Sequence, residues 1–405
     1  MNGSRLIQTL RIQNFLSFGP ESEAVDLQPL NLLIGPNASG KSNLIEALGL
    51  LRAAPADLTA PIREGGGVGE WLWKGAQGTP NATLETTVAY PEGRLPLRYR
   101  LSFTMVGQRL ELVDEAVENE RAFAGHTDAY FFYRYQNGHP TLNVRLRPEA
   151  QAGSEDDRTS RKLRREDLKL DQSVLSQRKD PDQYPELTYL GSQFAAIQLY
   201  REWNLGRYTA PRMPQRPDLP DDVLLEDASN LGLVLNSLQH QVETKRRMLE
   251  ELQRFYSAVE DVTTRIQGGT VQIFLHERGL RQPVPATRLS DGTLRYLCLL
   301  AILCHPQPPP LVCLEEPELG LHPDIIPALA ELLIEASRRT QLVVTTHSDT
   351  LVSALSHIPE AVLVCERDDQ GSRLQRLEPA QLKLWLEKYS LGQLWRMGEI
   401  GGNRW

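Results

Sequence analysis

Short, continuous apolar runs occur at three places in the chain: LNLLI at residues 30–34, LVCL at 311–314 and LVV at 342–344. Runs of this length, bounded by polar or glycine-rich stretches, are typical of strands buried on both faces of a sheet. The first run is followed by NLIEALGLL at residues 43–51, in which apolar positions recur with helical period. The pattern therefore predicts an α/β fold.

Between residues 82 and 112 the pattern changes to an alternation of apolar and polar positions, which predicts half-buried strands. Breaks at Pro91–Gly93 and at Gly107 predict hairpin turns. Two further alternating runs, at residues 129–135 and 141–146, flank Asn137-Gly138, a strong hairpin signal. We therefore expect an antiparallel β subdomain.

Helical period returns after a proline-rich connector at residues 211–222. One continuous helical span is expected over residues 230–259, too short for a long coiled coil. The apolar positions expected on one face are Leu231, Leu235, Leu238, Val242, Met248, Leu252 and Phe255. The stripe predicts a helical lobe in which the leucines are core packing, with partner binding as the alternative.

Composition narrows the protein class. A chain of 405 residues suggests two or three lobes. We expect a cytoplasmic protein without a membrane partner, because no apolar run approaches 18 residues and the N-terminus lacks a signal-peptide pattern. The four cysteines are expected to be buried thiols. A net charge of −8 argues against wholesale binding to nucleic acid but leaves room for a local basic patch.

GPNASGKS at residues 35–42 fits G-x-x-x-x-G-K-[ST] at every fixed position, between the predicted strand and helix. Gly35 and Gly40 permit turns that let backbone N–H groups wrap phosphates at the helix N-terminus. Lys41 is expected to reach the β and γ phosphates, and Ser42 to ligate Mg²⁺. The loop recognises phosphates, so GTP stays open beside ATP. The predicted nucleotide-binding residues are Gly35, Pro36, Asn37, Ala38, Ser39, Gly40, Lys41, Ser42 and Asn43.

Two other predicted strands end in residues suited to phosphate chemistry. LVCL ends in Glu315 and Glu316, which predicts a metal-binding carboxylate followed by one that polarises the attacking water. The alternative is an exposed acidic turn. The strand near 342–346 ends at His347, where a parallel sheet places ligand contacts, although a single histidine there is also compatible with a structural role.

The stretch LSDGT precedes a strongly apolar helix at residues 294–303. A hydroxyl and free N–H groups at a helix start can bind an anion. Ser290 is equally suited to be a plain N-cap. The stretch consists of Leu289, Ser290, Asp291, Gly292 and Thr293.

The order of these motifs resembles that of the ABC-type ATPases and, within them, the RecF/SMC/OLD branch. LIQTLRIQNFLSF at residues 6–18 looks like that branch's opening strand. EEPELGLHP and the tail LGQLWRMGEIGGNRW look closest to bacterial predicted AAA-type ATPases related to RecF and OLD. The resemblance implies an α/β P-loop ATPase head with a mixed sheet, an antiparallel β subdomain and an inserted helical lobe.

We expect four segments: 1–80, the first part of the ATPase head; 81–148, the β subdomain; 149–270, an inserted arm and helical lobe; and 271–405, the second part of the head. The resemblance further implies a homodimer that sandwiches ATP. Ser290 and Gly292 of one copy would touch the γ-phosphate held by Lys41 of the other.

The resemblance also assigns roles within the site. Glu316 matches the catalytic base, Glu315 the Mg²⁺ ligand, His347 the switch histidine and residues 319–322 the D-loop. The family usually has Asp at the metal position and ends its D-loop in Leu-Asp, so Glu315 and His322 are departures. Spacing does not single out a Q-loop glutamine among Gln77, Gln172, Gln177 and Gln193.

Residues 149–186 are polar, with few aromatic side chains. One hypothesis is an arm that contacts nucleic-acid phosphates. The alternative is a solvated, mobile helical excursion whose acidic residues offset the positive charge. The residues of the candidate arm are Arg158, Arg161, Lys162, Arg164 and Arg165.

Near the C-terminus, Glu366, Asp368 and Asp369 are expected to form a hairpin turn rather than a nuclease metal cluster. OLD-type proteins often carry a Toprim nuclease domain here, but only 58 residues follow His347. A nuclease acting in the same pathway is therefore expected to be another chain.

Three functions are open on this evidence. The first is an ATPase dimer that acts on DNA, or controls a separate nuclease or toxin-like effector chain, in DNA repair or anti-phage defence. The second is an ATP sensor or scaffold that hydrolyses weakly, which Glu315 keeps open. The third is a transporter motor, disfavoured by the gap of about 250 residues between Lys41 and Leu289.

Overall fold

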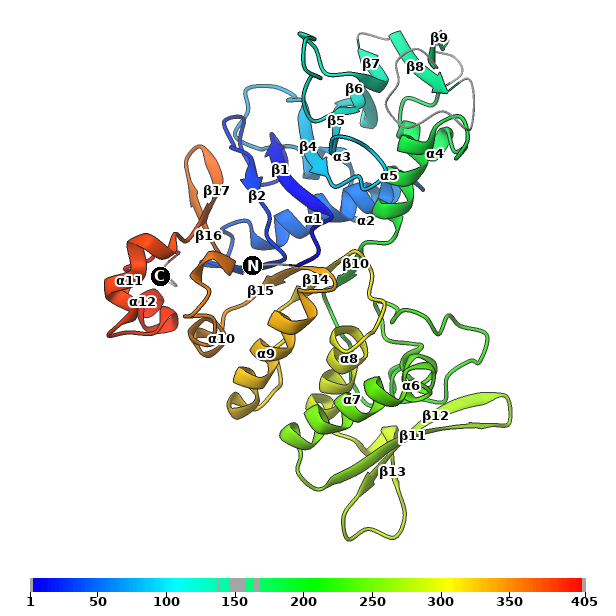
Figure 1. Cartoon of the computed structure of the whole chain (residues 1–405), viewed down its shortest axis with the longest axis vertical. Helices are drawn as coiled ribbons and strands as arrows, with labels where there is room; N and C mark the ends of the chain where they lie inside the picture. The colour runs from blue at the N-terminus through cyan, green and yellow to red at the C-terminus, as the bar shows by residue number, and fades with distance from the viewer. Residues whose placement is uncertain (1–2, 137–138, 146–157, 164–167, 403–405) are drawn as a thin grey trace.

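A six-stranded mixed sheet forms the centre of the molecule in the computed structural model, which describes residues 3–136, 139–145, 158–163 and 168–402 (Figure 1). In spatial order its strands are β10 (Gln198–Tyr200), β14 (Leu311–Glu315), β15 (Gln341–Thr345), β3 (Leu30–Ile34), β16 (Val362–Asp368) and β17 (Gly371–Arg376). The first five are parallel, and β17 is antiparallel to β16. The three predicted apolar strands are therefore neighbours.

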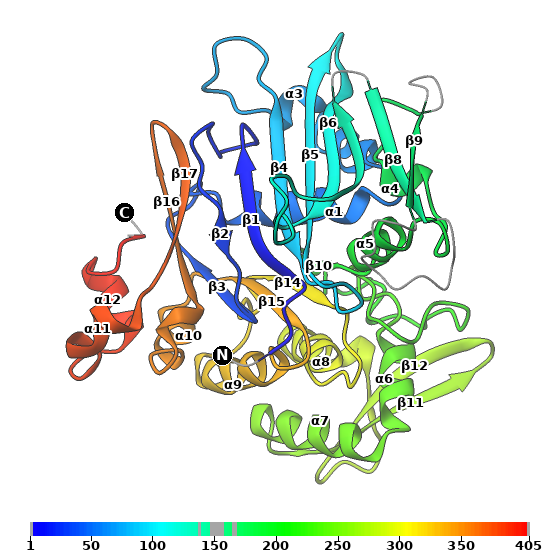
Figure 2. The ribbon, with the colours of Figure 1, turned by 45° about the horizontal axis from the view of Figure 1, so that its top comes forward.

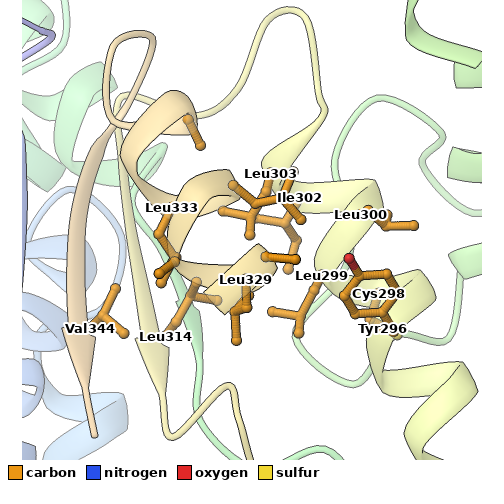
Figure 3. Close-up of a cluster of buried hydrophobic side chains, with 14 of the residues drawn as sticks. Tyr296, Cys298, Leu299, Leu300, Ile302, Leu303, Leu314, Leu329, Leu333 and Val344 are labelled. Atoms are coloured by element: carbon orange, nitrogen blue, oxygen red, sulfur yellow. The ribbon is translucent and has the colours of Figure 1, made fainter. Parts of the chain in front are cut away.

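Alternate residues of these strands enter two different cores. Leu33 and Val343 belong to the core that includes α1 (Lys41–Ala53). Leu32 and Val344 belong to the core on the other face. That face is covered by α8 (Asp291–Leu303) and α9 (Ile326–Ala336), whose leucines meet β14 and β15 (Figure 3). Burial on both faces explains the absence of polar alternation in these strands.

An eight-stranded antiparallel sheet lies on the other side of α1 (Figure 2). In spatial order its strands are β2 (Val25–Asp26), β1 (Ile7–Gln13), β4 (Ala82–Val88), β5 (Leu97–Val106), β6 (Arg109–Asn119), β7 (Phe131–Gln136), β8 (His139–Arg145) and β9 (Arg158–Lys162). The hairpins predicted on either side of Gly107 and around residues 137–138 pair as expected. The sheet also takes in β1 and β2, from the segment assigned above to the ATPase head.

Four helices pack in the same core as this sheet and α1. They are α2 (Thr59–Glu64), α3 (Val68–Trp71), α4 (Val174–Gln177) and α5 (Pro185–Ala195). The helical excursion considered for the basic arm is wrong for residues 158–162. Residues 158–162 instead extend the sheet as β9, paired with β8 from Thr141↔Lys162 to Arg145↔Arg158.

Beside α8, a lobe combines helices with a three-stranded antiparallel sheet and shares its core with that helix (Figure 1). Its elements are α6 (Leu231–Gln239), α7 (Val242–Phe255), β11 (Val259–Gln267), β12 (Thr270–Glu277) and β13 (Val284–Pro285). The single helical span predicted over residues 230–259 is wrong, because Gln241 has extended backbone and separates α6 from α7. Val242 consequently leaves the apolar face and is 79% exposed, whereas Leu238 and Leu252 are buried in the core.

The C-terminal part of the described chain contains α10 (Asp349–Ala354), α11 (Pro379–Leu386) and α12 (Leu391–Met397). The acidic residues near 368 lie at the end of β16 and in its turn to β17, as predicted, and Asp368 pairs with Arg373. All four cysteines are buried free thiols. No helix in the described ranges is long and apolar enough to cross a membrane. The predicted fold class is confirmed.

Candidate functional site

Four neighbouring strands end at the same edge of the six-stranded sheet. β3 leads into the phosphate-loop sequence, β15 into His347, β14 into Glu316 and β10 into Arg201. Carboxyl ends of adjacent parallel strands are the usual place for a ligand in α/β sheets. Here they line a cleft of about 320 Å³. The cleft brings together residues from three sequence motifs that are more than 250 positions apart at their extremes.

The loop after β3 depends on its two glycines. Gly35 has φ 150° and Gly40 φ 110°, both in a region that residues with a Cβ rarely adopt. A Cβ on Gly35 would collide with the carbonyl oxygen of Cys365, and one on Gly40 with the side chain of Ser372. The loop can therefore pass close to β16 and β17 only with glycine at these positions, and Gly40 directly precedes α1.

Lys41 is buried at the start of α1. Its Nζ donates hydrogen bonds to the carbonyl oxygens of Gly35, at 2.8 Å, and Pro36, at 2.9 Å. Burial lowers the pKa of Lys41, an effect that the nearby acidic groups of Cys365, Glu316 and Glu315 oppose. An ammonium held this way by its own loop can exchange carbonyl partners for phosphate oxygens without a large movement.

Asn43 lies in the first turn of α1 and connects the loop to the FLSF turn at residues 15–18. Its Nδ2 donates to Ser17 Oγ at 2.7 Å, and Ser372 Oγ donates to the same oxygen at 2.6 Å. The FLSF turn that contributed to the sequence resemblance thus contacts the phosphate loop directly.

The two carboxylates after β14 differ in their settings. Glu315 is the last residue of the strand, and its side chain is 17% exposed. Glu316 has φ 44°, a left-handed conformation that is strained for a glutamate and is found most often at functional sites. Its backbone N–H donates to the carbonyl of Thr345 at 3.1 Å, which locks the turn to the neighbouring strand.

His347 faces Glu316 across the cleft, with 3.6 Å between Nε2 and Oε1. This separation leaves both side chains near one position that a reacting water could occupy. The histidine loop is held by Glu318, which sequence analysis left without a role. Glu318 Oε1 accepts from the Thr346 hydroxyl and from the backbone N–H of His347, and burial raises the pKa of Glu318.

The residues predicted to hold Mg²⁺ fit that ion. Ser42 and Glu315 line the same cleft. Glu315 Oε1 is buried and has no hydrogen-bond partner among the residues described. A buried carboxylate oxygen without a partner is costly, and a hard cation would satisfy it. Mg²⁺ is typically bound through one or two protein oxygens together with substrate phosphates, which matches this sparse pair.

Arg201 and Glu202 also line the cleft and were missed by sequence analysis. They follow β10, a three-residue strand beside β14. The signal was present in the sequence, because the short apolar run IQLY ends in a charged pair, as LVCL does. None of the four glutamines considered for the Q-loop is among the described residues that line the cleft.

The LSDGT residues are not among the described residues that line this cleft, and they lie at the start of α8. The Ser290 hydroxyl caps that helix by accepting from the Thr293 N–H at 3.0 Å, so the N-cap assignment is correct for this conformation. The exposed Ser290 side chain can still meet a ligand from outside. A Cβ on Gly292 would crowd the carbonyl oxygen of Gly320, in the segment after Glu316.

A buried arginine holds the LSDGT segment in place through hydrogen bonds and an ion pair. Arg212 donates to the carbonyl oxygens of Leu205, Ala286 and Leu289, and it pairs with the carboxylate of Asp291. Arg212 lies in the proline-rich connector that sequence analysis treated only as a linker. Its role could not be inferred from spacing, since about 75 residues separate it from Ala286, Leu289 and Asp291.

Among the described residues of the basic arm, none lines the cleft. Arg158, Arg161 and Lys162 lie on β9, at the edge of the antiparallel sheet. Arg164 and Arg165 lie outside the described residues. A contact between this arm and nucleic acid stays a prediction.

Comparison with known families agrees with this geometry. A family model described as "AAA domain, putative AbiEii toxin, Type IV TA system" matches residues 30–353. No curated protein matches the sequence.

Among solved structures, the chain is similar to an SMC head bound to the C-winged helix domain of ScpA. The two are 14% identical and superpose with a TM-score of 0.58, and the match covers 93% of this chain and 99% of that chain. It is also similar to an SMC head with an extended coiled coil bound to the C-terminal domain of ScpA, from Pyrococcus furiosus, with 13% identity, 95% and 99% coverage and a TM-score of 0.56. At these identities the likeness establishes the fold, which agrees with the expected RecF/SMC branch.

Proposed function

The chain belongs to the family of AAA domains whose model matches it, and from this premise we propose that it is a Mg²⁺-dependent ATPase that works as a nucleotide-sandwiched dimer. One observation carries the proposal. Lys41, Glu315, Glu316 and His347 converge on one cleft, whereas Ser290 lies on the exposed start of α8, outside it. A second copy would supply the LSDGT residues that the cleft lacks.

The division of labour within the cleft follows from the contacts described above. The loop N–H groups and Lys41 would hold the phosphates, and Ser42 with Glu315 would hold Mg²⁺, which neutralises phosphate charge when bound. Glu316 would take up the proton of the attacking water as general base. His347 would orient that water or hydrogen-bond the γ-phosphate.

The proposal is tested with Glu316→Gln, which keeps the side-chain shape and removes the base. With ATP and Mg²⁺ this variant should accumulate as a dimer, measured by light scattering, with turnover reduced about 100-fold or more. Adding Lys41→Met to the same variant should restore the monomer. A variant that stays monomeric at saturating ATP, although it binds ATP, would refute the sandwich.

We propose that the closed dimer either controls a partner effector or acts on DNA. The family description names a toxin of a toxin–antitoxin system, and the similar SMC head is bound to ScpA, which supports a protein partner. Affinity capture of Glu316→Gln from its native cells, with ATP and Mg²⁺, separates the outputs. A nuclease or toxin-like chain in the eluate supports effector control, whereas DNA alone supports a repair clamp.

A second candidate is an ATP sensor that scarcely hydrolyses, favoured by Glu315 at the position where the family usually has Asp. Steady-state phosphate release decides between the two. Wild-type turnover near zero with and without DNA, together with ATP-dependent dimers, supports the sensor. Turnover that Glu316→Gln abolishes supports the ATPase.

A further inference from the structure

Arg201 connects helix α1 and strand β14, which carry the residues of the metal site. Its Nη1 donates to Glu46 Oε1 at 2.7 Å, and its Nε donates to Glu315 Oε2 at 3.3 Å. Glu46 lies on α1, one turn after Ser42. We infer that Arg201 is a positioning residue that orients Glu315 for Mg²⁺, with Glu46 as its anchor. This inference rests on the proposed function, since it takes Glu315 to be a metal ligand.

The two oxygens of Glu315 have opposite surroundings. Oε2 accepts from Arg201, whereas Oε1 is buried without a hydrogen-bond partner among the described residues. A carboxylate with one oxygen held and the other free is arranged to bind a cation through the free oxygen. Outer partners of this kind fix the orientation of metal ligands and raise metal affinity.

The arrangement explains how glutamate can serve at this position. Glutamate has one more rotatable bond than aspartate, and fixing a longer side chain costs more conformational entropy. The hydrogen bond from Arg201 restricts that freedom before the metal arrives. The extra methylene also lets Glu315 reach toward Arg201 while its other oxygen stays in the cleft.

Glu46 is needed to keep the metal site negatively charged in the presence of Arg201. A guanidinium beside Glu315 alone would cancel the carboxylate and repel a divalent cation. Glu46 adds a second negative charge, so the three side chains together remain net negative. Their exposures, 29% for Arg201, 30% for Glu46 and 17% for Glu315, place them where water screens the charges less than at the open surface.

The inference is tested by the Mg²⁺ dependence of nucleotide binding, which does not require turnover. Metal-stripped protein is mixed with a fluorescent ATP analogue and titrated with Mg²⁺. Arg201→Met should raise the half-saturating Mg²⁺ concentration about 10- to 100-fold, the range seen when outer partners of metal ligands are removed. Affinity for the analogue in EDTA should stay close to wild type. Arg207→Met, an exposed arginine of the same loop, is the matched control and should leave both unchanged.

Two further variants guard against a trivial loss of structure. Glu46→Gln keeps the side-chain shape and should shift the Mg²⁺ requirement in the same direction as Arg201→Met, by a smaller factor. In a Glu315→Asp background the shorter carboxylate should depend less on Arg201, so the effect of Arg201→Met should shrink. Equal effects of Arg201→Met in both backgrounds would overturn the inference.

The remaining outcomes are also decisive. An unchanged Mg²⁺ requirement in Arg201→Met, with a wild type that needs Mg²⁺, refutes the role of Arg201 alone. An equal loss of analogue affinity in EDTA shows that Arg201 contacts phosphate instead. A wild type that binds the analogue with no response to Mg²⁺ refutes the metal site in the proposed function itself.

Discussion

The cleft and the LSDGT segment are two parts of one expected ATP site, but the protein builds them differently. The cleft contains a buried ammonium, a glutamate with φ 44° and one buried carboxylate oxygen, Glu315 Oε1, without a hydrogen-bond partner among the described residues. The LSDGT segment has a capped helix start and a buried arginine that satisfies its carbonyl groups. Of these two parts, the cleft is therefore the one that contains backbone strain and a polar atom without a hydrogen-bond partner in the part of the chain that the structure describes.

This difference suggests which part receives the nucleotide first. Strained backbone and unpartnered buried groups persist where the surrounding structure enforces them, and a ligand that satisfies them is bound more tightly. The cleft therefore has energetic reasons to bind nucleotide and metal by itself. The LSDGT segment is stable without a ligand, which suits a surface that meets the nucleotide only after a second copy approaches.

The largest effect is expected from a substitution that impairs ATP binding in the cleft and leaves the LSDGT segment unchanged. Lys41→Met keeps most of the buried side-chain volume but removes the charge, and charge-assisted hydrogen bonds of this kind contribute about 1.5–3 kcal/mol each. ATP affinity should fall about 10- to 100-fold, as measured by calorimetry. Lys388→Met, at an exposed position, is the control. ATP affinity equal to wild type would show that the loop binds phosphates without its lysine.

The second prediction separates the two interpretations of Ser290. Ser290→Asp keeps an effective N-cap but places a negative charge where the partner's γ-phosphate is expected. Thermal stability and ATP affinity of the monomer should stay near wild type. The ATP-dependent dimer should weaken at least about tenfold, since each 1.4 kcal/mol of repulsion is a factor of ten.

Ser290→Ala provides the matching control for the cap, because it removes the hydroxyl without adding charge. It should cost stability by about 1 kcal/mol and weaken the dimer less than Ser290→Asp. A Ser290→Asp protein that dimerises normally with ATP would make Ser290 a cap and nothing more.

The two parts also differ in how well the sequence predicts them. The cleft was predictable because its residues belong to motifs with short, fixed spacing and follow strands that are apolar throughout, as in β3 and β14. Glu318 and Arg212 could not be assigned, because each acts through partners that are distant in sequence. Arg201 was missed although the run IQLY before it carries the same signal as LVCL. The break at Gln241 was missed because a helical period continues across it, although the backbone does not.

The third prediction weakens the support of the LSDGT segment. Arg212→Met removes the donors that satisfy three buried carbonyl oxygens, and each unsatisfied group costs about 1–3 kcal/mol. The free energy of unfolding should fall by about 3 kcal/mol in denaturant titrations. Dimerisation should weaken, while Mg²⁺–ATP binding by the folded monomer stays intact. Arg216→Met, whose arginine pairs with Asp218 at the surface, should change none of these. A fall in monomer ATP affinity equal to that of Lys41→Met would refute the separation of the two parts.

The smallest effect is expected at Glu318, which shapes the cleft without facing the reaction. Glu318→Gln keeps an oxygen that can accept from Thr346 and from the His347 N–H, so turnover should change less than about fivefold, which corresponds to under about 1 kcal/mol in the transition state. Glu318→Ala removes both acceptor contacts and should reduce turnover about tenfold by releasing the histidine loop. ATP affinity should be unaffected in both variants, because Glu318 does not line the cleft. The contrast between Gln and Ala distinguishes positioning from charge. If Glu318→Gln were as damaging as Glu318→Ala, the buried carboxylate itself would be required, and the strained side of the site would include a third acidic group with a direct part in the chemistry.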